Sequence, residues 1–134
     1  MGAIAVCGSA QCPRGETILV VEDEVLVRMA LAETLRDEGF SVLEATNADE
    51  ALAVLASATP LDVVLTDVNM PGSLDGVALG RYVRAARPGL KVIVVSGRVP
   101  SEAAAEAADA FLAKPYEPAS IVRTIDALLS DRPG

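Results

Sequence analysis

Charged and hydroxyl side chains that could handle a metal or a phosphate follow short apolar segments at four places in this 134-residue chain. Glu22 and Asp23 come first, followed by Asp67, Ser96 and Lys114. Carboxylates offer the oxygen ligands that a hard divalent cation prefers. A carboxylate can also attack phosphorus, and a lysine can neutralise charge on phosphoryl oxygens. These residue types therefore indicate metal-assisted phosphoryl transfer.

Taken singly, each of these residues has an ordinary structural explanation. The pair Glu22-Asp23 would usually be a solvated turn, and Asp67 could cap a helix or a turn. Ser96 with the following glycine is a common turn, and an isolated Lys114 is a typical surface lysine. The functional interpretation therefore depends on the fold bringing the four places together.

Short aliphatic segments alternate with segments of helical character along the chain, which predicts alternating strands and helices. The expected strands are Thr17–Val21, Ser41–Ala45, Asp62–Asp67, Lys91–Val95 and Ala110–Ala113. The expected helices are Val25–Glu38, Asn47–Ser57, Gly76–Ala86, Ser101–Ala108 and Pro118–Leu129. This alternation predicts an α/β fold, with a parallel sheet covered by helices on both faces.

Local signals mark the ends of the first two helices. Gly39 is a preferred residue just after a helix, and Asn47 with Glu50 three residues later predicts a capped helix start. Apolar residues at helical spacing mark the face of the first helix: Val25, Met29, Ala32 and Leu35.

In an open parallel sheet, the carboxyl ends of the strands lie at one edge, where ligands bind. The polar residues singled out above each sit at or just past such an end, so we expect them to converge. Two like unit charges about 4 Å apart repel by about 4 kcal/mol at an effective dielectric constant near 20. Three carboxylates beside a single lysine therefore need a further positive charge, and Mg²⁺ suits them best.

The composition excludes several classes of function. The formal charge is −8, which argues against nucleic-acid binding. The chain has no His, so a histidine base, a phosphohistidine carrier and a His-containing zinc site are excluded. No apolar run approaches the roughly 20 residues of a membrane span. We therefore expect a soluble cytoplasmic protein without a membrane partner.

The first 16 residues lack any period and are expected to form a flexible extension. Their apolar run is too short for a secretory signal, and Val6 stands where a myristoylation sequence needs Ser or Thr. Cys7 and Cys12 match neither a CxxC pair nor a metal knuckle and are interpreted as incidental thiols. One domain is expected over residues 17–131, with no output domain.

Four segments of the chain resemble the receiver domains of bacterial two-component response regulators. They are ILVVEDE (18–24), VVLTDVNMPGSLDG (63–76), VIVVSG (92–97) and FLAKPY (111–116). Each is weak alone, but the ordered set is specific, and the similarity runs from Thr17 to about Ser130. The resemblance implies a flavodoxin-like receiver fold of the stand-alone type, with a doubly wound five-stranded sheet of order 2-1-3-4-5.

The resemblance also implies a role for each residue of the acidic cluster. Asp67 corresponds to the phosphoacceptor. Glu22 and Asp23 correspond to the acid pair that holds Mg²⁺, directly or through water, with Mn²⁺ an expected substitute. Asn69 is expected to give its backbone carbonyl to the same ion.

Further roles follow from the same resemblance for the last two strands. Lys114 corresponds to the lysine that contacts the phosphoryl oxygens, and its bond to Pro115 is expected to be cis. Ser96 matches the hydroxyl that follows the phosphoryl group. Phe111 falls at the switch aromatic, for which simple packing on the last strand is the alternative. Tyr116 is interpreted as a packing residue.

Two departures from the family pattern concern loops. The segment from Met70 to Gly76 is one residue longer than the common version. The segment from Ser96 to Lys114 is several residues shorter, so a short or poorly formed fourth helix is expected. Because receivers often dimerise through that helix, we expect a monomer or a weak homodimer.

The function that the resemblance implies is that of a phosphoacceptor regulator, not an enzyme acting on external substrates. The phosphoryl donor would be a histidine kinase or a phosphotransfer protein, and the downstream protein is unknown. A phosphate sink, a phosphorelay intermediate and a phosphorylation-independent scaffold stay open.

Two other classes fit the residues less well. An FMN-binding flavodoxin would need a Ser/Thr/Gly-rich loop where this chain has Glu22-Asp23-Glu24. A phosphatase resembling haloacid dehalogenases would place its nucleophile after the first strand with a second Asp two residues on, a pattern that this chain does not meet.

Overall fold

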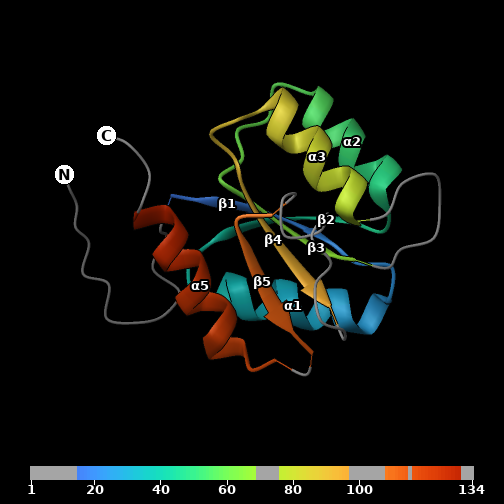
Figure 1. Ribbon diagram of the computed structural model, residues 1–134. Coiled ribbons are helices and arrows are strands. Elements are labelled where there is room, and N and C mark those ends of the chain that lie inside the picture. The colour runs from blue at the N-terminus through green and yellow to red at the C-terminus, as the bar shows by residue number, and fades with distance from the viewer. Residues whose placement is uncertain (1–14, 69–75, 97–107, 115, 131–134) are drawn as a thin grey trace.

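Five parallel strands form one sheet in the order β2-β1-β3-β4-β5 (Figure 1). The computed structural model describes residues 15–68, 76–96, 108–114 and 116–130. The strands are β1 (Thr17–Val21), β2 (Ser41–Ala45), β3 (Val63–Asp67), β4 (Lys91–Ser96) and β5 (Ala110–Ala113). The predicted strand order is confirmed. The winding reverses between β1 and β3, the switch point at which α/β sheets bind ligands.

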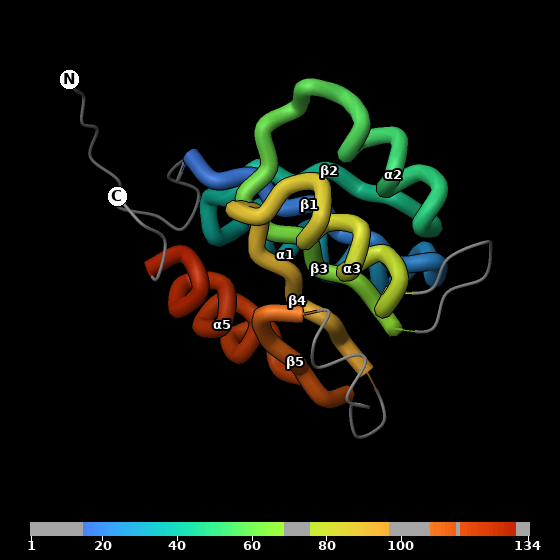
Figure 2. Tube along the Cα trace, turned by 45° about the horizontal axis from the view of Figure 1, so that its top comes forward, coloured from blue at the N-terminus to red at the C-terminus, as the bar shows by residue number. Residues whose placement is uncertain are grey.

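Helices cover both faces of the sheet, as the tube in Figure 2 also shows. They are α1 (Val25–Asp37), α2 (Ala48–Ala56), α3 (Gly76–Ala86) and α5 (Pro118–Ser130). Leu35 of α1 and Ile121 of α5 pack into the core on one face. Leu55 of α2 and Leu79 of α3 pack into the core on the other. The doubly wound α/β arrangement is therefore confirmed.

The central strands carry mostly aliphatic residues because each of their faces is covered by helices. In β1, Ile18 and Val20 belong to the core beneath α1 and α5, whereas Leu19 and Val21 belong to the core beneath α2 and α3. All four are at most 1% exposed. Full burial of such a side chain contributes about 1.5–3 kcal/mol. This burial holds the carboxyl end of β1, and the acids that follow it, in a fixed place.

The predicted strand bounds hold to within one residue. β3 begins at Val63 rather than Asp62, and the Asp62 carboxylate accepts a hydrogen bond from the Thr17 amide at 2.8 Å. β4 extends to Ser96, whose carbonyl oxygen accepts a hydrogen bond from the Lys114 amide at 2.9 Å. This hydrogen bond holds the carboxyl ends of β4 and β5 next to each other.

The helix-end signals are confirmed. Gly39 follows α1 with a φ of 98°, a left-handed conformation that glycine adopts without strain. The Asn47 side chain accepts a hydrogen bond from the Glu50 amide at 2.8 Å, and the Glu50 carboxylate accepts one from the Thr46 amide at 2.7 Å. The conformation of Gly39 thus marks the end of α1, and the two hydrogen bonds fix the start of α2.

The buried face of α1 differs from the predicted one. Its buried residues are Leu31, Ala32 and Leu35. Val25 and Met29 were expected on the same face but are 54% and 55% exposed. Successive helix residues turn by about 100°, so the expected set spans a wide arc and its first two members lie at the margin of the buried stripe.

Some expectations concern residues outside the described ranges and stay predictions. They are the extension with Cys7 and Cys12, the Asn69 carbonyl, the longer loop before Gly76, the shortened fourth helix and the cis bond to Pro115. Within the described ranges, none of the helices has the length and hydropathy needed to cross a bilayer.

Candidate functional site

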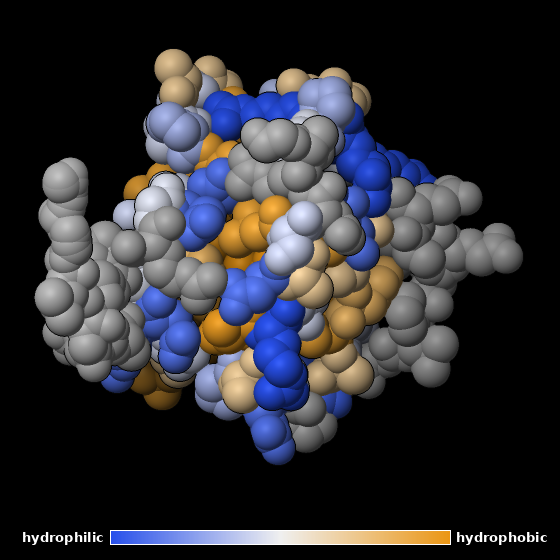
Figure 3. Space-filling view, turned by 90° about the vertical axis from the view of Figure 1, so that its left-hand side faces the viewer, coloured by the Kyte–Doolittle hydropathy of each residue, from blue (hydrophilic) through white to orange (hydrophobic). Residues whose placement is uncertain are grey.

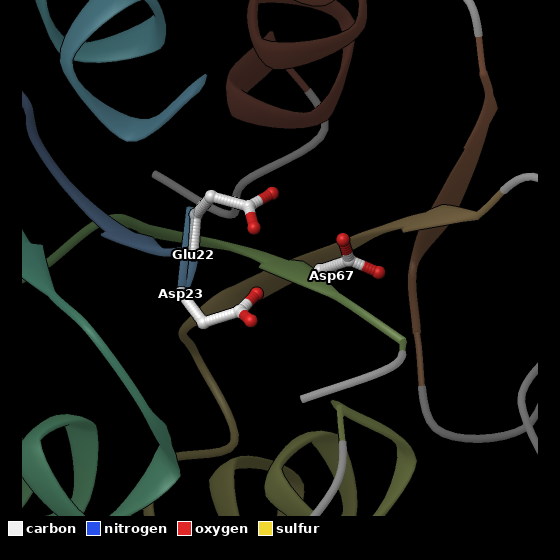
Figure 4. Close-up of side chains that lie close together, drawn as sticks. All are labelled: Glu22, Asp23 and Asp67. Carbon is white, nitrogen blue, oxygen red and sulfur yellow. The ribbon is translucent and has the colours of Figure 1, made fainter. Parts of the chain in front are cut away.

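Carboxylates from two neighbouring strands meet at the carboxyl edge of the sheet (Figure 4). Glu22 and Asp23 follow β1, and Asp67 ends β3. The two strands pair directly, and one carboxylate oxygen of each of the three acids lies within 4.8 Å of the other two. The structure therefore brings these three acids together, as the positions of the strand ends predicted.

The three acids differ in their access to solvent. Glu22 and Asp67 are buried, with 5% and 8% of their surface exposed, whereas Asp23 is exposed. The cluster thus has two carboxylates fixed inside the sheet edge and one at its outer rim. Asp23 is therefore the acid of this cluster that is most accessible to solvent.

Lys114 contacts the acid cluster from the end of β5. Its Nζ lies 2.6 Å from Oδ2 of Asp67, and its side chain is 37% exposed. Burial alone would lower the pKa of Lys114, but the hydrogen bond to Asp67 and the negative charges of Asp67 and Glu22 outweigh it, so this pKa is raised. The lysine is therefore an ammonium ion at neutral pH, fixed against Asp67.

The structure places Ser96 beside Asp67 in the sheet and Phe111 against the margin of the core. Ser96 ends β4 directly after Val95, which pairs with Asp67, and its residue surface is only 5% exposed. Phe111 pairs with Val94 and packs, half-buried, against the core beneath α2 and α3. The switch roles of Ser96 and Phe111 stay predictions.

Glu22 is the acid whose ionisation the fold disfavours most clearly. The pKa of Glu22 is raised from 4.5 to about 7, and burial is the largest cause. The hydrogen bond with the Asp23 side chain and the charge of Asp67 also raise this pKa. The hydrogen bond from the Glu24 amide and the charge of Lys114 lower it. The raised pKa of Glu22 thus reflects mainly its removal from water, with a smaller contribution from the neighbouring acids.

We expect the free energy of unfolding of the metal-free protein to fall as pH rises from about 4.5 to about 7. Over this window the folded protein still holds the Glu22 proton that the unfolded chain has released. Above it, Glu22 is ionised in both states and its contribution is constant. Urea unfolding in EDTA across this pH range measures the effect. Glu22→Gln should flatten the profile relative to the parent protein, and an unchanged slope would contradict the assignment.

The donor set fits Mg²⁺. Glu22, Asp23 and Asp67 offer only oxygen ligands, and Mg²⁺ prefers oxygen and usually retains several waters. The exposed position of Asp23 leaves space for such waters. These three residues would hold the ion, directly or through water.

Two residues beside the cluster were not singled out from the sequence. Arg28 of α1 donates from Nη1 to the Glu22 carbonyl oxygen at 3.1 Å. Gly76, the first residue of α3, lies so close to β3 that an added Cβ would be 2.1 Å from the Asp67 carbonyl oxygen. An arginine inside a helix carries no sequence signal of this kind. Glycine allows a close approach of main chains, so Gly76 was a usable signal.

At the opposite edge of the sheet, two acids accept hydrogen bonds from main-chain amides of neighbouring strands. The Asp62 carboxylate accepts a hydrogen bond from the Thr17 amide, and the Asp109 carboxylate accepts one from the Val92 amide, both at 2.8 Å. Figure 3 views the molecule from the side where β1 begins and shows hydrophobic side chains framed by hydrophilic ones. The clustering of acids near one another is thus a feature of the carboxyl edge.

Comparison with known proteins gives one family. The profile of the response regulator receiver domain matches residues 18–126. The chain is 36% identical over 118 residues to the sensor kinase CckA of Brucella abortus, an alignment that covers 84% of this chain and 12% of that protein. The chain spans 12% and 24% of the length of the first curated relatives that it matches.

Solved structures agree with the sequence match. A response regulator receiver protein from Sinorhizobium medicae superposes with a TM-score of 0.82 at 29% identity, covering 90% of this chain and 98% of that one. The response regulator TrrA of Thermotoga maritima, in complex with Mg²⁺–BeF, superposes with a TM-score of 0.78 at 29% identity. That alignment covers 84% of this chain and 98% of that one.

Proposed function

Because this chain belongs to the response regulator receiver domain family, we propose that Asp67 accepts a phosphoryl group in a Mg²⁺-dependent reaction. Receiver domains are the phosphoacceptor signalling domains of two-component systems. One observation carries the assignment of Asp67. It is a buried carboxylate that lies close to the acids Glu22 and Asp23 and has the Lys114 ammonium 2.6 Å away.

The proposed reaction is an in-line transfer from a phosphohistidine. The Asp67 carboxylate oxygen forms the new O–P bond while the P–N bond to the imidazole breaks, and the imidazole nitrogen keeps the electron pair. Lys114, which now binds Asp67, would bind a phosphoryl oxygen as charge develops there. Bound Mg²⁺ would supply further positive charge to balance the charge that develops on the phosphoryl group. The Mg²⁺–BeF complex of TrrA supports this cofactor.

The signal is proposed to leave the site through the ends of β4 and β5. Phosphorylation would bias an existing equilibrium between two conformations, in which Ser96 and Phe111 differ. The hydrogen bond from the Lys114 amide to the Ser96 carbonyl supports this route, because it ties the lysine to β4. Slow hydrolysis of the aspartyl phosphate, promoted by the domain itself, would reset the equilibrium.

The proposed phosphoryl donor is a histidine kinase or a phosphotransfer protein. A sensor kinase and transcriptional regulators are among the relatives of this chain, so a relay, a phosphate sink and a regulator of a further protein all stay open. The cytoplasmic location, the substitution by Mn²⁺ and the monomer or weak homodimer also stay predictions. The family match does not support the alternatives of an FMN-binding flavodoxin or a phosphatase resembling haloacid dehalogenases.

Labelling with radioactive acetyl phosphate tests the proposal. We expect the protein to incorporate phosphate in MgCl₂ and to lose this incorporation in EDTA. Hydroxylamine should release the label, because it cleaves acyl phosphates, and borohydride reduction with peptide mass spectrometry should locate it at Asp67. Labelling that persists in EDTA or resists hydroxylamine would contradict the proposal.

A further inference from the structure

Arg28 connects three elements around the acid pair. Its Nε lies 3.1 Å from Oε1 of Glu44 on β2, and its Nη1 donates to the Glu22 carbonyl oxygen at 3.1 Å. Its side chain is only 13% exposed. The guanidinium thus bridges α1, β2 and the segment that follows β1.

The carbonyl that Arg28 binds belongs to the peptide unit that joins Glu22 to Asp23. The Glu22 amide donates to the Ala45 carbonyl oxygen at 3.0 Å, which continues the pairing of β1 with β2. The Glu22 carboxylate accepts a hydrogen bond from the Glu24 amide at 3.2 Å. The orientation of this peptide unit therefore determines where both acids point.

We propose that Arg28 is a positioning residue for the metal-binding acid pair, an inference that rests on the function proposed above. Its planar guanidinium binds the Glu44 carboxylate on one edge and holds the Glu22–Asp23 peptide unit with another donor. A lysine ammonium lacks that fixed fork. Outer partners that orient metal ligands typically change metal affinity by 10- to 100-fold when they are removed.

Whether Mg²⁺ binds more weakly or more tightly after Arg28 is removed distinguishes a positioning role from a purely electrostatic one. A positive charge near three carboxylates, taken alone, opposes the binding of a divalent cation. Removal of Arg28 would then strengthen Mg²⁺ binding. If Arg28 instead holds the acids in place, its removal weakens Mg²⁺ binding despite the lost repulsion.

Arg36 provides a matched control on the same helix. Its Nη1 lies 3.1 Å from Oε2 of the same Glu44, and its Nη2 donates to the Val42 carbonyl oxygen at 3.0 Å. Arg36→Ala therefore removes an ion pair with Glu44 and a hydrogen bond to a main-chain carbonyl, as Arg28→Ala does. Only in Arg28→Ala is that carbonyl part of the acid pair.

The experiment follows backbone amide shifts by NMR during MgCl₂ titration of the full chain. We expect Arg28→Ala to raise the Mg²⁺ concentration for half-saturation by about tenfold. Arg36→Ala should stay within about twofold of the parent protein. In acetyl phosphate labelling, Arg28→Ala should need more Mg²⁺ but approach the parent rate once Mg²⁺ saturates. Arg28→Lys should restore the affinity only in part.

Each other outcome has a definite meaning. Unchanged or tighter Mg²⁺ binding by Arg28→Ala overturns the positioning role, and full rescue by Arg28→Lys overturns the part assigned to the guanidinium fork. If Arg28→Ala does not fold, Arg28→Gln replaces it under the same criteria. If the parent protein itself binds no Mg²⁺, the proposed function fails rather than this inference.

Discussion

Replacement of Asp67 by Asn is expected to reduce Mg²⁺-dependent labelling by acetyl phosphate to background. An amide oxygen is a poor nucleophile towards phosphorus, and the change also removes one of the three clustered carboxylates. The Asn side chain keeps the size of Asp and can still accept a hydrogen bond from Lys114, so the fold should persist. Incorporated radioactivity per protein, read over the same time course, measures the effect.

Asp62→Asn is the matched control for this variant. Asp62 directly precedes the same strand but lies at the opposite edge of the sheet, where its carboxylate binds the Thr17 amide at 2.8 Å. Asp62→Asn should therefore keep its labelling. Full labelling of Asp67→Asn would mean that another residue is the phosphoacceptor and would overturn the proposed function.

Gly76→Ala is expected to have the largest effect on stability among substitutions beside the site. The new Cβ would lie 2.1 Å from the Asp67 carbonyl oxygen and 2.9 Å from Cα of Val68. Both are main-chain atoms, one in the last residue of β3 and one in the residue that follows it, and they cannot rotate away as a side chain can. The start of α3 must therefore move off β3, which costs about 3 kcal/mol if repacking is partial. The shift of the urea unfolding midpoint measures this cost.

The same substitution should disturb the chemistry, because the added Cβ presses on the main chain of Asp67 itself. We expect Gly76→Ala to label more slowly even at temperatures where it is fully folded. Gly89→Ala is the control, since a Cβ at Gly89 would meet nothing within 4 Å and its stability should change by no more than about 0.5 kcal/mol. Equal stabilities for the two variants would mean that α3 adjusts freely.

Most of the fold followed from local patterns in the sequence. A strand covered on both faces must be aliphatic throughout, so the run from Thr17 to Val21 could be recognised without a structure. Helix ends were equally local, because Gly39 and Asn47 act through conformations and hydrogen bonds within one turn. Parallel pairing then required the strand ends to share an edge, which predicted that Glu22 and Asp67 lie close together.

The sequence by itself thus determined the strands and the acids and lysine that converge at their ends. The order of the strands followed from the resemblance to receiver domains. Only the tertiary structure decided how these groups interact: the 2.6 Å contact of Lys114 with Asp67, the guanidinium of Arg28 on the Glu22 carbonyl, and the approach of Gly76 to β3. It also decided that Met29 faces solvent. The reason is physical, since periodicity reports which face of a segment is buried, whereas contacts between segments depend on how helices and strands pack in three dimensions.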